Sequence, residues 1–548
     1  VDDIRATVTV DQGTTDNATV SVTTPSSSSA IIPANDGSQQ FVVTFHIEDR
    51  NDSASIENFE INIDLEKYEP QVYDYFDFEV NDDNTTVTLT SFDEDLADTT
   101  DIVIPESVSQ NESGQWIDGN SYKVTDILSA TLTSDGVFYN SVITSIEFPS
   151  TLETIGNFAF RSCSGLTEVV LGNCTSLTSI GNGVFSGCSG LTSITLPSSL
   201  TSIGYSALSQ CSRLTEVGLS NCTSLTSIEN GTFFYCSGLT SITLPSSLTS
   251  IGDLAFEYCS GVETLEYKGT IDQWLSIELG SSWMGDISHT FIVNGEELTN
   301  LVVPEGVTSI GDSAFYGCSG FTSITLPSSL EAIRDYAFYY CLELETLEYK
   351  GTIDQWLSID FGSTWMFDSS HTFIVNGEEL TNLVVPEGVT SIGERAFYGC
   401  RGLTSITLPS SLEAIRDYAF YYCSRLSGEL DLGNCTSLTS IGYSAFYGCT
   451  SLTSITLPSS LTSIGGSAFF DCSGFTSVTI NQYVFENVTS TSSSCGYILS
   501  SIGYGRTVLV PANLIDDLHL TNSYLDDESE FTRSATANED GYYVYTKI

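Results

Sequence analysis

A single stretch of 23 residues decides the fold of this chain. It runs from Leu239 to Gly261 and reads LTSITLPSSLTSIGDLAFEYCSG, and close copies of it start at Leu191, Phe321, Leu403 and Leu452. When Leu239 is numbered position 1, apolar residues recur at positions 1, 4, 6, 10, 13, 17, 18 and 21. A fixed period of this length indicates a repeat architecture, in which each unit buries its apolar side chains against its neighbours.

Each part of the repeat predicts a local structure. The alternation in L-x-x-I-x-L favours a short strand with Leu and Ile pointing inward and Thr or Ser pointing outward. Proline at position 7 ends this strand because it cannot donate to the ladder, and glycine at position 14 favours a turn. We expect A-F-x-x-C to form one turn of α- or 3₁₀-helix that buries Phe and Cys. The stacked strands are expected to form one long parallel sheet on the concave face.

Position 21 of the repeat is a cysteine. It recurs at Cys163, Cys188, Cys211, Cys236, Cys259, Cys318, Cys341, Cys400, Cys423, Cys449 and Cys472. Adjacent strands lie about 5 Å apart, close enough for disulfide bridging, but cysteine is also a good small buried residue. We expect a ladder of buried, reduced thiols. Zinc has little support, because neither histidine nor a C-x-x-C motif accompanies these cysteines.

The pattern LTSITLPSSLTSIGxxAFxxC resembles the BspA-like leucine-rich repeat, which occurs in surface proteins of host-associated bacteria and some protists. The resemblance covers about Asn84 to Thr479. TDIVIPESV and YKVTDI resemble the segment that opens the array in such proteins, and RTVLVPANLIDDL resembles their closing cap. The resemblance implies secretion, surface display and binding to host or neighbouring-cell glycoproteins. The partner itself does not follow from it.

We therefore predict an α/β repeat fold, a leucine-rich-repeat solenoid with a small N-terminal β-sandwich. Residues 1–83 lack the repeat, and period-two segments such as FVVTFHIED favour the sandwich there. Residues 84–480 form the solenoid, with two helix-hairpin insertions at 262–297 and 344–379. Residues 481–548 form a C-terminal cap.

The two insertions are near-identical copies, 82 residues apart. Thr270 and Gln273 make a T-x-x-Q capping box, which predicts a short helix over IDQWLSIEL. The dipeptide Asn294-Gly295, between FIV and EEL, predicts a type I′ hairpin. Four tryptophans recur in register: Trp274, Trp283, Trp356 and Trp365. They either pack the longer repeat unit or line a pair of matched ligand pockets beside the hairpins.

Position 19 is often aromatic, and its tyrosines are Tyr316, Tyr339, Tyr398, Tyr421 and Tyr447. The position lies between the buried Phe and Cys, so we expect these side chains to point partly outward. Stacked at about 5 Å per repeat, they would form a stripe along the solenoid. An exposed aromatic stripe favours contact with another chain or a glycan. The alternative is that the rings stack on each other and stay partly covered.

The charge of the chain is lopsided, with 16 Lys and Arg against 70 Asp and Glu and a net charge of −54. Such a surface repels nucleic acid and anionic membranes, and no apolar run is long enough to span a membrane. Either such a surface attracts basic partners or divalent cations, or it keeps the chain soluble in a salty or calcium-containing medium. Asp49, Asn51 and Asp52, which follow a predicted strand, are candidate calcium ligands, although a polar loop is the simpler explanation. No other cofactor is expected.

An extracellular, secreted or cell-surface location is expected. The chain starts at Val1 rather than Met, which suggests a processed mature chain. N-x-S/T sequons predict glycosylation at Asn17, Asn51, Asn84, Asn111, Asn230 and Asn487. The sequons at Asn173, Asn221 and Asn434 are discounted, because cysteine is their middle residue and they lie inside repeats.

Enzyme activity is not expected. His289 and His371 occupy the same place in the two copies, and the sequence contains no H-E-x-x-H, G-x-S-x-G or P-loop motif. An enzyme would usually break the repeat symmetry with a unique reactive cluster. We expect a structural or adhesive extracellular glycoprotein that self-associates into a fibre or coat. The alternatives are a monomeric adhesin that binds glycoproteins or glycans through its sheet or hairpins, and an ice- or mineral-binding Thr-rich face.

Overall fold

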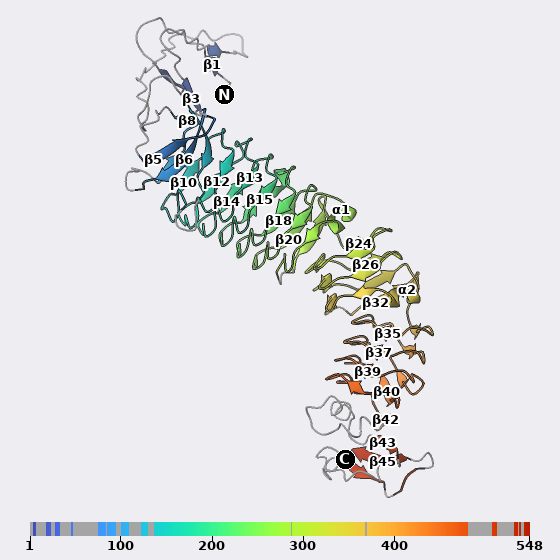
Figure 1. Ribbon diagram of the computed structural model, residues 1–548. Helices are drawn as coiled ribbons and strands as arrows, with labels where there is room; N and C mark the ends of the chain where they lie inside the picture. Colours follow the sequence, from blue (N-terminus) through green and yellow to red (C-terminus); the bar gives the residue numbers. More distant parts are fainter. Residues whose placement is uncertain are drawn as a thin grey trace. The chain divides into compact units, whose positions relative to one another are not determined.

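The computed structural model describes fifteen stretches of the chain (Figure 1). They are residues 4–6, 18–22, 28–32, 45–47, 75–83, 85–94, 100–108, 122–129, 136–285, 288–367, 370–479, 507–511, 531–534, 536–538 and 542–547. The chain divides into two compact units, residues 1–74 and residues 75–548.

The first unit contains two antiparallel strand pairs among its described residues. Strand β1 (Ile4–Ala6) pairs with β4 (Phe45–Ile47), and β2 (Ala18–Val22) pairs with β3 (Ser28–Ile32). The β-sandwich expected for residues 1–83 stays a prediction. Asp49, Asn51 and Asp52, the candidate calcium ligands, lie outside the described residues.

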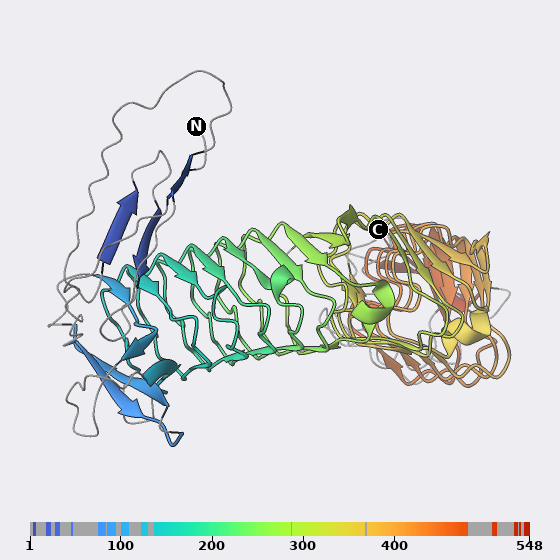
Figure 2. The same ribbon diagram turned by 90° about the horizontal axis from the view of Figure 1, so that it is seen from above.

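The second unit is a β-solenoid in which one repeat, here called a rung, contributes two short parallel strands. The first strand comes from positions 3 to 6 and the second from positions 12 and 13. In the early rungs the first series is β7 (Asp101–Val103), β10 (Ser145–Glu147), β12 (Glu168–Val170), β14 (Ser193–Thr195) and β16 (Glu216–Val217). The expectation of one long sheet was wrong, because the short T-S-I-G segments pair as a second ladder. Figure 2 shows these rungs stacked along the array.

The second series continues an antiparallel hairpin that opens the array. That hairpin is β5 (Phe76–Val80) with β6 (Thr86–Phe92), and β8 (Ser107–Val108) pairs at the side of β9 (Tyr122–Ile127). Beyond β9 the parallel strands are β11 (Thr154–Ile155), β13 (Ser179–Ile180), β15 (Ser202–Ile203), β17 (Ser227–Ile228), β19 (Ser250–Ile251) and β21 (Glu278–Leu279).

Each inserted hairpin ends the sheet to which it belongs. The first such sheet holds β18 (Ser241–Leu244), β20 (Thr264–Tyr267), β22 (Thr290–Val293) and β23 (Glu296–Glu297). The second holds β24 (Asn300–Val302), β26 (Ser323–Leu326), β29 (Thr346–Tyr349), β32 (Thr372–Val375) and β33 (Glu378–Glu379). Beside them run β25 (Ser309–Ile310), β27 (Ala332–Ile333) and β30 (Asp360–Phe361), and β28 (Phe338–Tyr339) pairs with β31 (Met366–Phe367).

The last rungs lead into the C-terminal strands. Strand β34 (Asn382–Val384) pairs with β36 (Ser405–Thr407), and the second series is β35 (Ser391–Ile392), β37 (Ala414–Ile415), β39 (Ser440–Ile441) and β41 (Ser463–Ile464). The final sheet holds β38 (Gly428–Asp431), β40 (Leu452–Thr456), β42 (Ser477–Thr479), β43 (Thr507–Pro511), β45 (Tyr542–Lys547) and β44 (Phe531–Arg533). Because β45 and β44 run antiparallel, they close the parallel ladder.

The third side of each rung, positions 14 to 21, consists of turns. Within a rung, Ala159 N–H donates to the carbonyl of Gly156, three residues earlier. The N–H groups of Phe158 and Ser162 instead donate to carbonyls of the next rung, at 2.8 and 2.7 Å. These two residues, at positions 16 and 20, have positive φ angles of 59° and 64°. The helix expected for A-F-x-x-C was wrong, because the positive φ angles at positions 16 and 20 interrupt it and every second N–H, as in Phe158, Phe160 and Ser162, donates to the neighbouring rung.

Helix is therefore rare in this fold, and the expectation of an α/β repeat was wrong. The described residues contain the five-residue helices α1 (Ile271–Leu275) and α2 (Ile353–Leu357) and one 3₁₀ turn, η1 (Leu219–Asn221). The glycine at position 14 allows neighbouring rungs to approach closely, whereas the repeat pattern predicted a turn there. A Cβ atom on Gly156 would lie 2.2 Å from the backbone nitrogen of Ser129, so glycine permits close approach of two rungs.

The phenylalanines at position 18 form the core, as predicted. Phe160, Phe256, Phe315, Phe397, Phe446 and Phe469 are fully buried. Rings of neighbouring rungs stack on one another, with centroids 5.3 Å apart for Phe397 and Phe420. These rings form aromatic stacks that Leu208 interrupts between Phe185 and Phe233, and the loss of a ring would leave a cavity.

The cysteines are buried free thiols, as predicted. All fourteen among the described residues are unpaired with one another. The Cys188 Sγ donates to the carbonyl of Phe160 at 3.1 Å, and the Cys472 Sγ donates to the carbonyl of Phe446 at 3.2 Å. Burial raises the pKa of Cys423 and Cys472 to about 12, so both stay protonated at neutral pH. Position 21 thus suits a small side chain that donates weakly to the rung before it.

Candidate interaction site

The insertions have the local structure that the sequence predicts. The Thr270 Oγ1 accepts from the backbone of Gln273 at 3.3 Å, and the Gln273 Oε1 accepts from the backbone of Thr270 at 2.9 Å. These two bonds make the capping box of α1, and the equivalent box caps α2. Asn294 and Gly295 have φ angles of 53° and 86°, as a type I′ turn between β22 and β23 requires.

The tryptophans of the insertions are buried packing residues. Trp274, Trp283, Trp356 and Trp365 are at most 1% exposed. The Nε1 atoms of Trp274 and Trp283 donate to the carbonyls of Ala314 and Ser313 at 3.0 and 3.1 Å. The interpretation that these four rings line ligand pockets was therefore wrong. They fill the longer rung and fix the backbone of the rung that follows.

The tyrosines at position 19 are more covered than we expected. Tyr316 and Tyr398 are only 6% and 2% exposed, whereas Tyr339, Tyr421 and Tyr447 are half-buried. The cause is stacking, with centroids 5.5 Å apart for Tyr316 and Tyr339 and 4.8 Å apart for Tyr421 and Tyr447. The prediction of outward-pointing rings is therefore wrong for Tyr316 and Tyr398.

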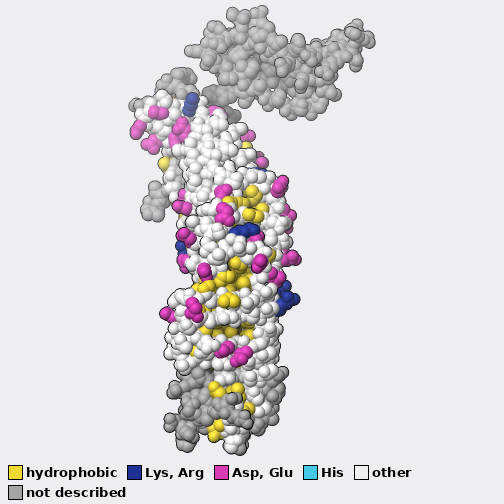
Figure 3. Space-filling view, turned by 90° about the vertical axis from the view of Figure 1, so that its right-hand side faces the viewer, with side chains coloured by type: hydrophobic (Ala, Val, Ile, Leu, Met, Phe, Trp, Pro, Cys, Tyr) yellow, Lys and Arg dark blue, Asp and Glu magenta, His cyan; other side chains and the backbone are white. Residues whose placement is uncertain are grey.

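Tyrosines at positions 16 and 20 provide the exposed part of this surface, and sequence reasoning missed them. Tyr336 is 43% and Tyr422 is 42% exposed, and both have positive φ. We call the whole set the tyrosine face. It comprises Tyr316, Tyr336, Tyr339, Tyr340, Tyr398, Tyr418, Tyr421, Tyr422 and Tyr447. Figure 3 shows one side of the array, on which hydrophobic side chains, a class that includes tyrosine, gather in patches, with acidic side chains around them and a Lys or Arg side chain between two patches.

A cleft of about 470 Å³ lies in the tyrosine face beside the first insertion. We call it the tyrosine cleft. Its lining residues are Glu257, Tyr258, Ser260, Ser282, Met284, Gly285, Ser313, Tyr316, Tyr336 and Tyr339. The cleft thus combines aromatic ring surfaces, small hydroxyl groups and one carboxylate. Such a lining suits a side chain that has both a flat apolar surface and a positive charge.

The second insertion has an arginine where the first has a serine. Arg395 stands 82 residues after Ser313, and its guanidinium carbon lies 4.2 Å from the ring centroid of Tyr418. The same carbon lies 5.6 Å from the centroid of Tyr398. The Arg395 Nε donates to the carbonyl of Ser363 at 3.2 Å, and the side chain is nearly buried. Here the tyrosine face holds a guanidinium group that belongs to the chain itself.

A column of Asn and Asp at position 15 links the rungs. The Asn182 side chain accepts from the backbone of Tyr205 at 2.9 Å, and that of Asp253 accepts from Ser281 at 2.7 Å. Asn230, a predicted glycosylation site, belongs to this column and accepts from Asp253 at 3.0 Å. Glycosylation at Asn230 stays a prediction. Asn17, Asn51, Asn84, Asn111 and Asn487 lie outside the described residues.

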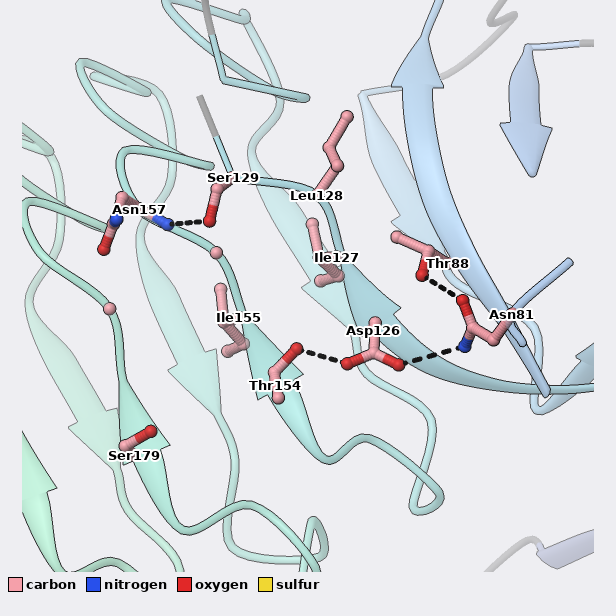
Figure 4. Close-up of a pocket in the computed structure, with 12 residues that line it drawn as sticks. Asn81, Thr88, Asp126, Ile127, Leu128, Ser129, Thr154, Ile155, Asn157 and Ser179 are labelled. Carbon is pink, nitrogen blue, oxygen red and sulfur yellow. Dashed lines mark hydrogen bonds between the residues drawn. The ribbon is translucent and has the colours of Figure 1, made fainter. Parts of the chain in front are cut away.

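A second, more polar cleft of about 480 Å³ lies at the start of the array (Figure 4). Asp126 of β9 is at its centre, and its carboxylate accepts from the Thr154 hydroxyl and, at 3.2 Å, from the Asn81 amide. The Asn81 Oδ1 accepts in turn from Thr88 at 2.7 Å. Because these groups bond each other, they join the opening hairpin to the first rungs, and we assign no ligand to this cleft.

The part of the chain that the structure describes has neither a metal-binding cluster nor a membrane-spanning helix. There, no three His, Cys, Asp or Glu side chains lie close enough together to hold a metal ion. His289 and His371 are each buried beside a cysteine, with the His289 Nε2 3.7 Å from the Cys318 Sγ. None of the described helices has the length and apolar character needed to cross a bilayer.

Comparison with known proteins gives a family. Residues 131–263, 286–364 and 369–495 match the BspA type leucine rich repeat region in six copies. No protein among those with curated functions matches the chain.

Several solved structures are similar to the chain. A leucine-rich repeat protein from Bacteroides ovatus is 27% identical, with a TM-score of 0.42, over 76% of this chain and 96% of that one. A leucine rich cell surface protein from Faecalibacterium prausnitzii is 22% identical, with a TM-score of 0.37, over 75% of this chain and 93% of that one. The pneumococcal vaccine antigen PcpA is 20% identical, with a TM-score of 0.32, over 74% and 86%.

Proposed function

The chain belongs to the BspA-type leucine-rich-repeat family, and from this premise we propose that it is a non-enzymatic surface protein that binds another protein through its tyrosine face. The observation that carries the proposal is the face itself, in which tyrosines from successive rungs stack and leave ring edges exposed. Tyrosine supplies a large, rigid contact area with a polar end, and aromatic side chains are enriched at protein interfaces.

Charge favours a foreign, basic partner over a second copy of the chain. The sequence has a net charge of −54, so two copies repel one another at long range, whereas a basic surface is steered toward the chain. Self-association into a fibre or coat is therefore the second candidate function. It would require that cations screen the charge or that a small apolar contact outweigh it.

Extracellular display and glycosylation complete the proposal. Membership of the family supports display at the cell surface. N-glycosylation at the six predicted sequons and calcium binding at Asp49, Asn51 and Asp52 rest on the sequence alone. Glycopeptide mapping of the native protein would test the sequons directly.

The test compares tyrosines on the face with a tyrosine away from it. Tyr336→Ser and Tyr422→Ser, combined, remove two exposed rings of the face, and Tyr205→Ser removes a still more exposed ring outside the set. Binding to purified extracellular glycoproteins would be measured by surface plasmon resonance. We expect the double variant to lose affinity by about tenfold or more and the Tyr205→Ser control to bind as the original chain does.

Two results would contradict the proposal. Equal binding by the double variant and the control would show that the face is not the contact surface. A rise in mass with concentration in analytical ultracentrifugation, abolished by the double variant, would replace the foreign partner with a second copy of this chain.

A further inference from the structure

The two insertion copies show which chemical group the tyrosine cleft suits. We infer that the cleft beside the first insertion binds an arginine side chain of a basic protein partner. This inference rests on the proposed function, because it names the group that the partner would present. It is carried by the arrangement around Arg395 in the second copy.

The same tyrosine frame surrounds both places. Tyr316 and Tyr336 line the cleft, and their counterparts 82 residues later are Tyr398 and Tyr418. Tyr316 stacks on Tyr339 with centroids 5.5 Å apart, and Tyr398 stacks on Tyr421 with centroids 4.9 Å apart. The frame that holds a guanidinium in the second copy is therefore repeated in the first.

The residue that fills the frame differs between the copies. In the second copy the Arg395 guanidinium lies over the ring of Tyr418, and its Nε is 3.8 Å from the Glu394 Oε1. In the first copy the equivalent residue is Ser313, whose side chain is too short to reach across the frame. Ser313 lines the open cleft together with Tyr316 and Tyr336, the counterparts of the two tyrosines that the Arg395 guanidinium lies against. In the second copy, the Arg395 guanidinium of the chain itself therefore occupies the tyrosine frame, and the first copy has no such group.

The charge of the cleft agrees with a cationic ligand. The Glu257 carboxylate lines it, whereas the residue 82 positions later, at the equivalent place in the second copy, is the uncharged Tyr339. The first frame therefore has a carboxylate where the second has a tyrosine. A carboxylate and ring faces together attract a cation more strongly than either alone.

Arginine fits this frame better than lysine does. Its guanidinium is planar, is more weakly hydrated than an ammonium, and stacks on aromatic rings while its N–H groups bond in the plane. In the second copy Arg395 does both, since it covers the Tyr418 ring and donates to the Ser363 carbonyl. The hydroxyl groups of Ser260 and Ser282 line the cleft and provide acceptors for the same purpose.

The experiment uses the full chain and a defined probe. The probe is the peptide acetyl-Gly-Ser-Arg-Ser-Gly-amide with a benzophenone at one end, and matched peptides carry citrulline or lysine in place of arginine. After irradiation, cross-linked residues are mapped by mass spectrometry. We expect the arginine peptide to label residues 257–339 and the uncharged citrulline peptide to label them about tenfold less.

Two exchanges between the copies provide matched variants. Ser313→Arg places in the first copy the residue that the second already accommodates, and we expect it to reduce labelling of residues 257–339 about tenfold. Arg395→Ser should open the second frame and produce new labelling of residues 395–422. Tyr336→Ala, at an exposed position, gives an independent loss of labelling if Ser313→Arg does not fold, and circular dichroism checks each variant.

The outcomes separate this inference from the proposed function. The arginine assignment would be overturned if Ser313→Arg and Tyr336→Ala left the labelling unchanged. It would also be overturned if the citrulline peptide labelled the cleft as strongly as the arginine peptide. If the arginine assignment fails but the double variant Tyr336→Ser with Tyr422→Ser still abolishes glycoprotein binding, the proposed function stands without the arginine assignment. If Ser313→Arg and Tyr336→Ala abolished labelling by the arginine peptide but left glycoprotein binding unchanged, the arginine assignment would be supported. The proposed function would then be contradicted.

Discussion

Residues 263–341 and 345–423 are two copies of the same pair of rungs, and a comparison between them separates what folds the chain from what varies on it. The copies differ at nine positions: Glu278/Asp360, Leu279/Phe361, Ser282/Thr364, Gly285/Phe367, Ile287/Ser369, Asp312/Glu394, Ser313/Arg395, Ser319/Arg401 and Phe321/Leu403. The capping box, the tryptophans, the hairpin, the phenylalanines at position 18 and the cysteines are the same in both.

Several of the changes meet at the tyrosine cleft. Ser282, Gly285 and Ser313 line it in the first copy, and all three are replaced by larger residues in the second. The chain has therefore kept the structure of the rungs while it altered the space between the tyrosines. This pattern is the one expected when a duplicated element keeps its fold and only one copy keeps an open site.

The largest expected effect concerns what the copies share. Phe315→Ala and Phe397→Ala should each lower the free energy of unfolding by about 3–5 kcal/mol. Both rings are fully buried, and each stacks on the next rung with centroids 5.5 and 5.3 Å apart. Urea unfolding followed by circular dichroism would measure the loss. The losses in unfolding free energy of the two variants should agree to within about 1 kcal/mol. A difference of more than about 2 kcal/mol would show that the two copies do not share one core.

A smaller effect is expected where the copies differ most. Arg395→Ser should cost about 2 kcal/mol, because it removes the stacking on Tyr418 and the bond to Ser363 and leaves a cavity. Ser313→Arg, the reverse exchange, should cost less or stabilise the chain. Thermal unfolding of the two variants would be compared with that of the original chain. A neutral Arg395→Ser would mean that the guanidinium contributes nothing to the second frame.

The tryptophans should differ by a single hydrogen bond. Trp283 Nε1 donates to the Ser313 carbonyl, whereas the buried Nε1 of Trp365 has no hydrogen-bond partner among the described residues. Trp283→Phe should therefore cost about 1 kcal/mol more than Trp365→Phe. Paired urea titrations would resolve this difference, and equal costs would indicate that the two indoles are bonded alike.

A pH dependence of stability is expected at Glu394 in the second copy. Burial, opposed by Arg395, raises the pKa of Glu394 to about 7, above its ordinary value of 4.5. Between these values the folded chain holds a proton that the unfolded chain releases, so stability falls as pH rises from about 4.5 through 7. Glu394→Gln should remove this part of the pH dependence of the melting temperature. An identical pH profile in the variant would contradict the assignment.

The repeat pattern was enough to predict the stacking, the buried phenylalanines and the thiols, because those positions are apolar in nearly every copy. It did not predict the backbone at positions 16 and 20. Bulky residues such as Phe158 and Tyr336 adopt positive φ there, and only hydrogen bonding between stacked rungs explains that choice. Local preference favoured a helical turn at this place, and the contacts between rungs overrode it.

The candidate site was only partly predictable for a related reason. The aromatic stripe is visible in the sequence, but which rings are exposed depends on how Tyr316 and Tyr398 stack beneath their neighbours. The exchange of Ser313 for Arg395 is also visible in the duplication. Only the structure shows that the arginine lies over a tyrosine ring and that its counterpart borders an open cleft.

The most direct test of the account is a crystal structure of the full chain soaked with acetyl-arginine methylamide. The account predicts density for the guanidinium in the tyrosine cleft, with its carbon about 4–6 Å from the ring centroid of Tyr336, as Arg395 lies over Tyr418. The same soak of the Ser313→Arg variant should leave the cleft without the compound. An empty cleft in the original chain, with the compound bound only at scattered surface carboxylates, would contradict the central claim.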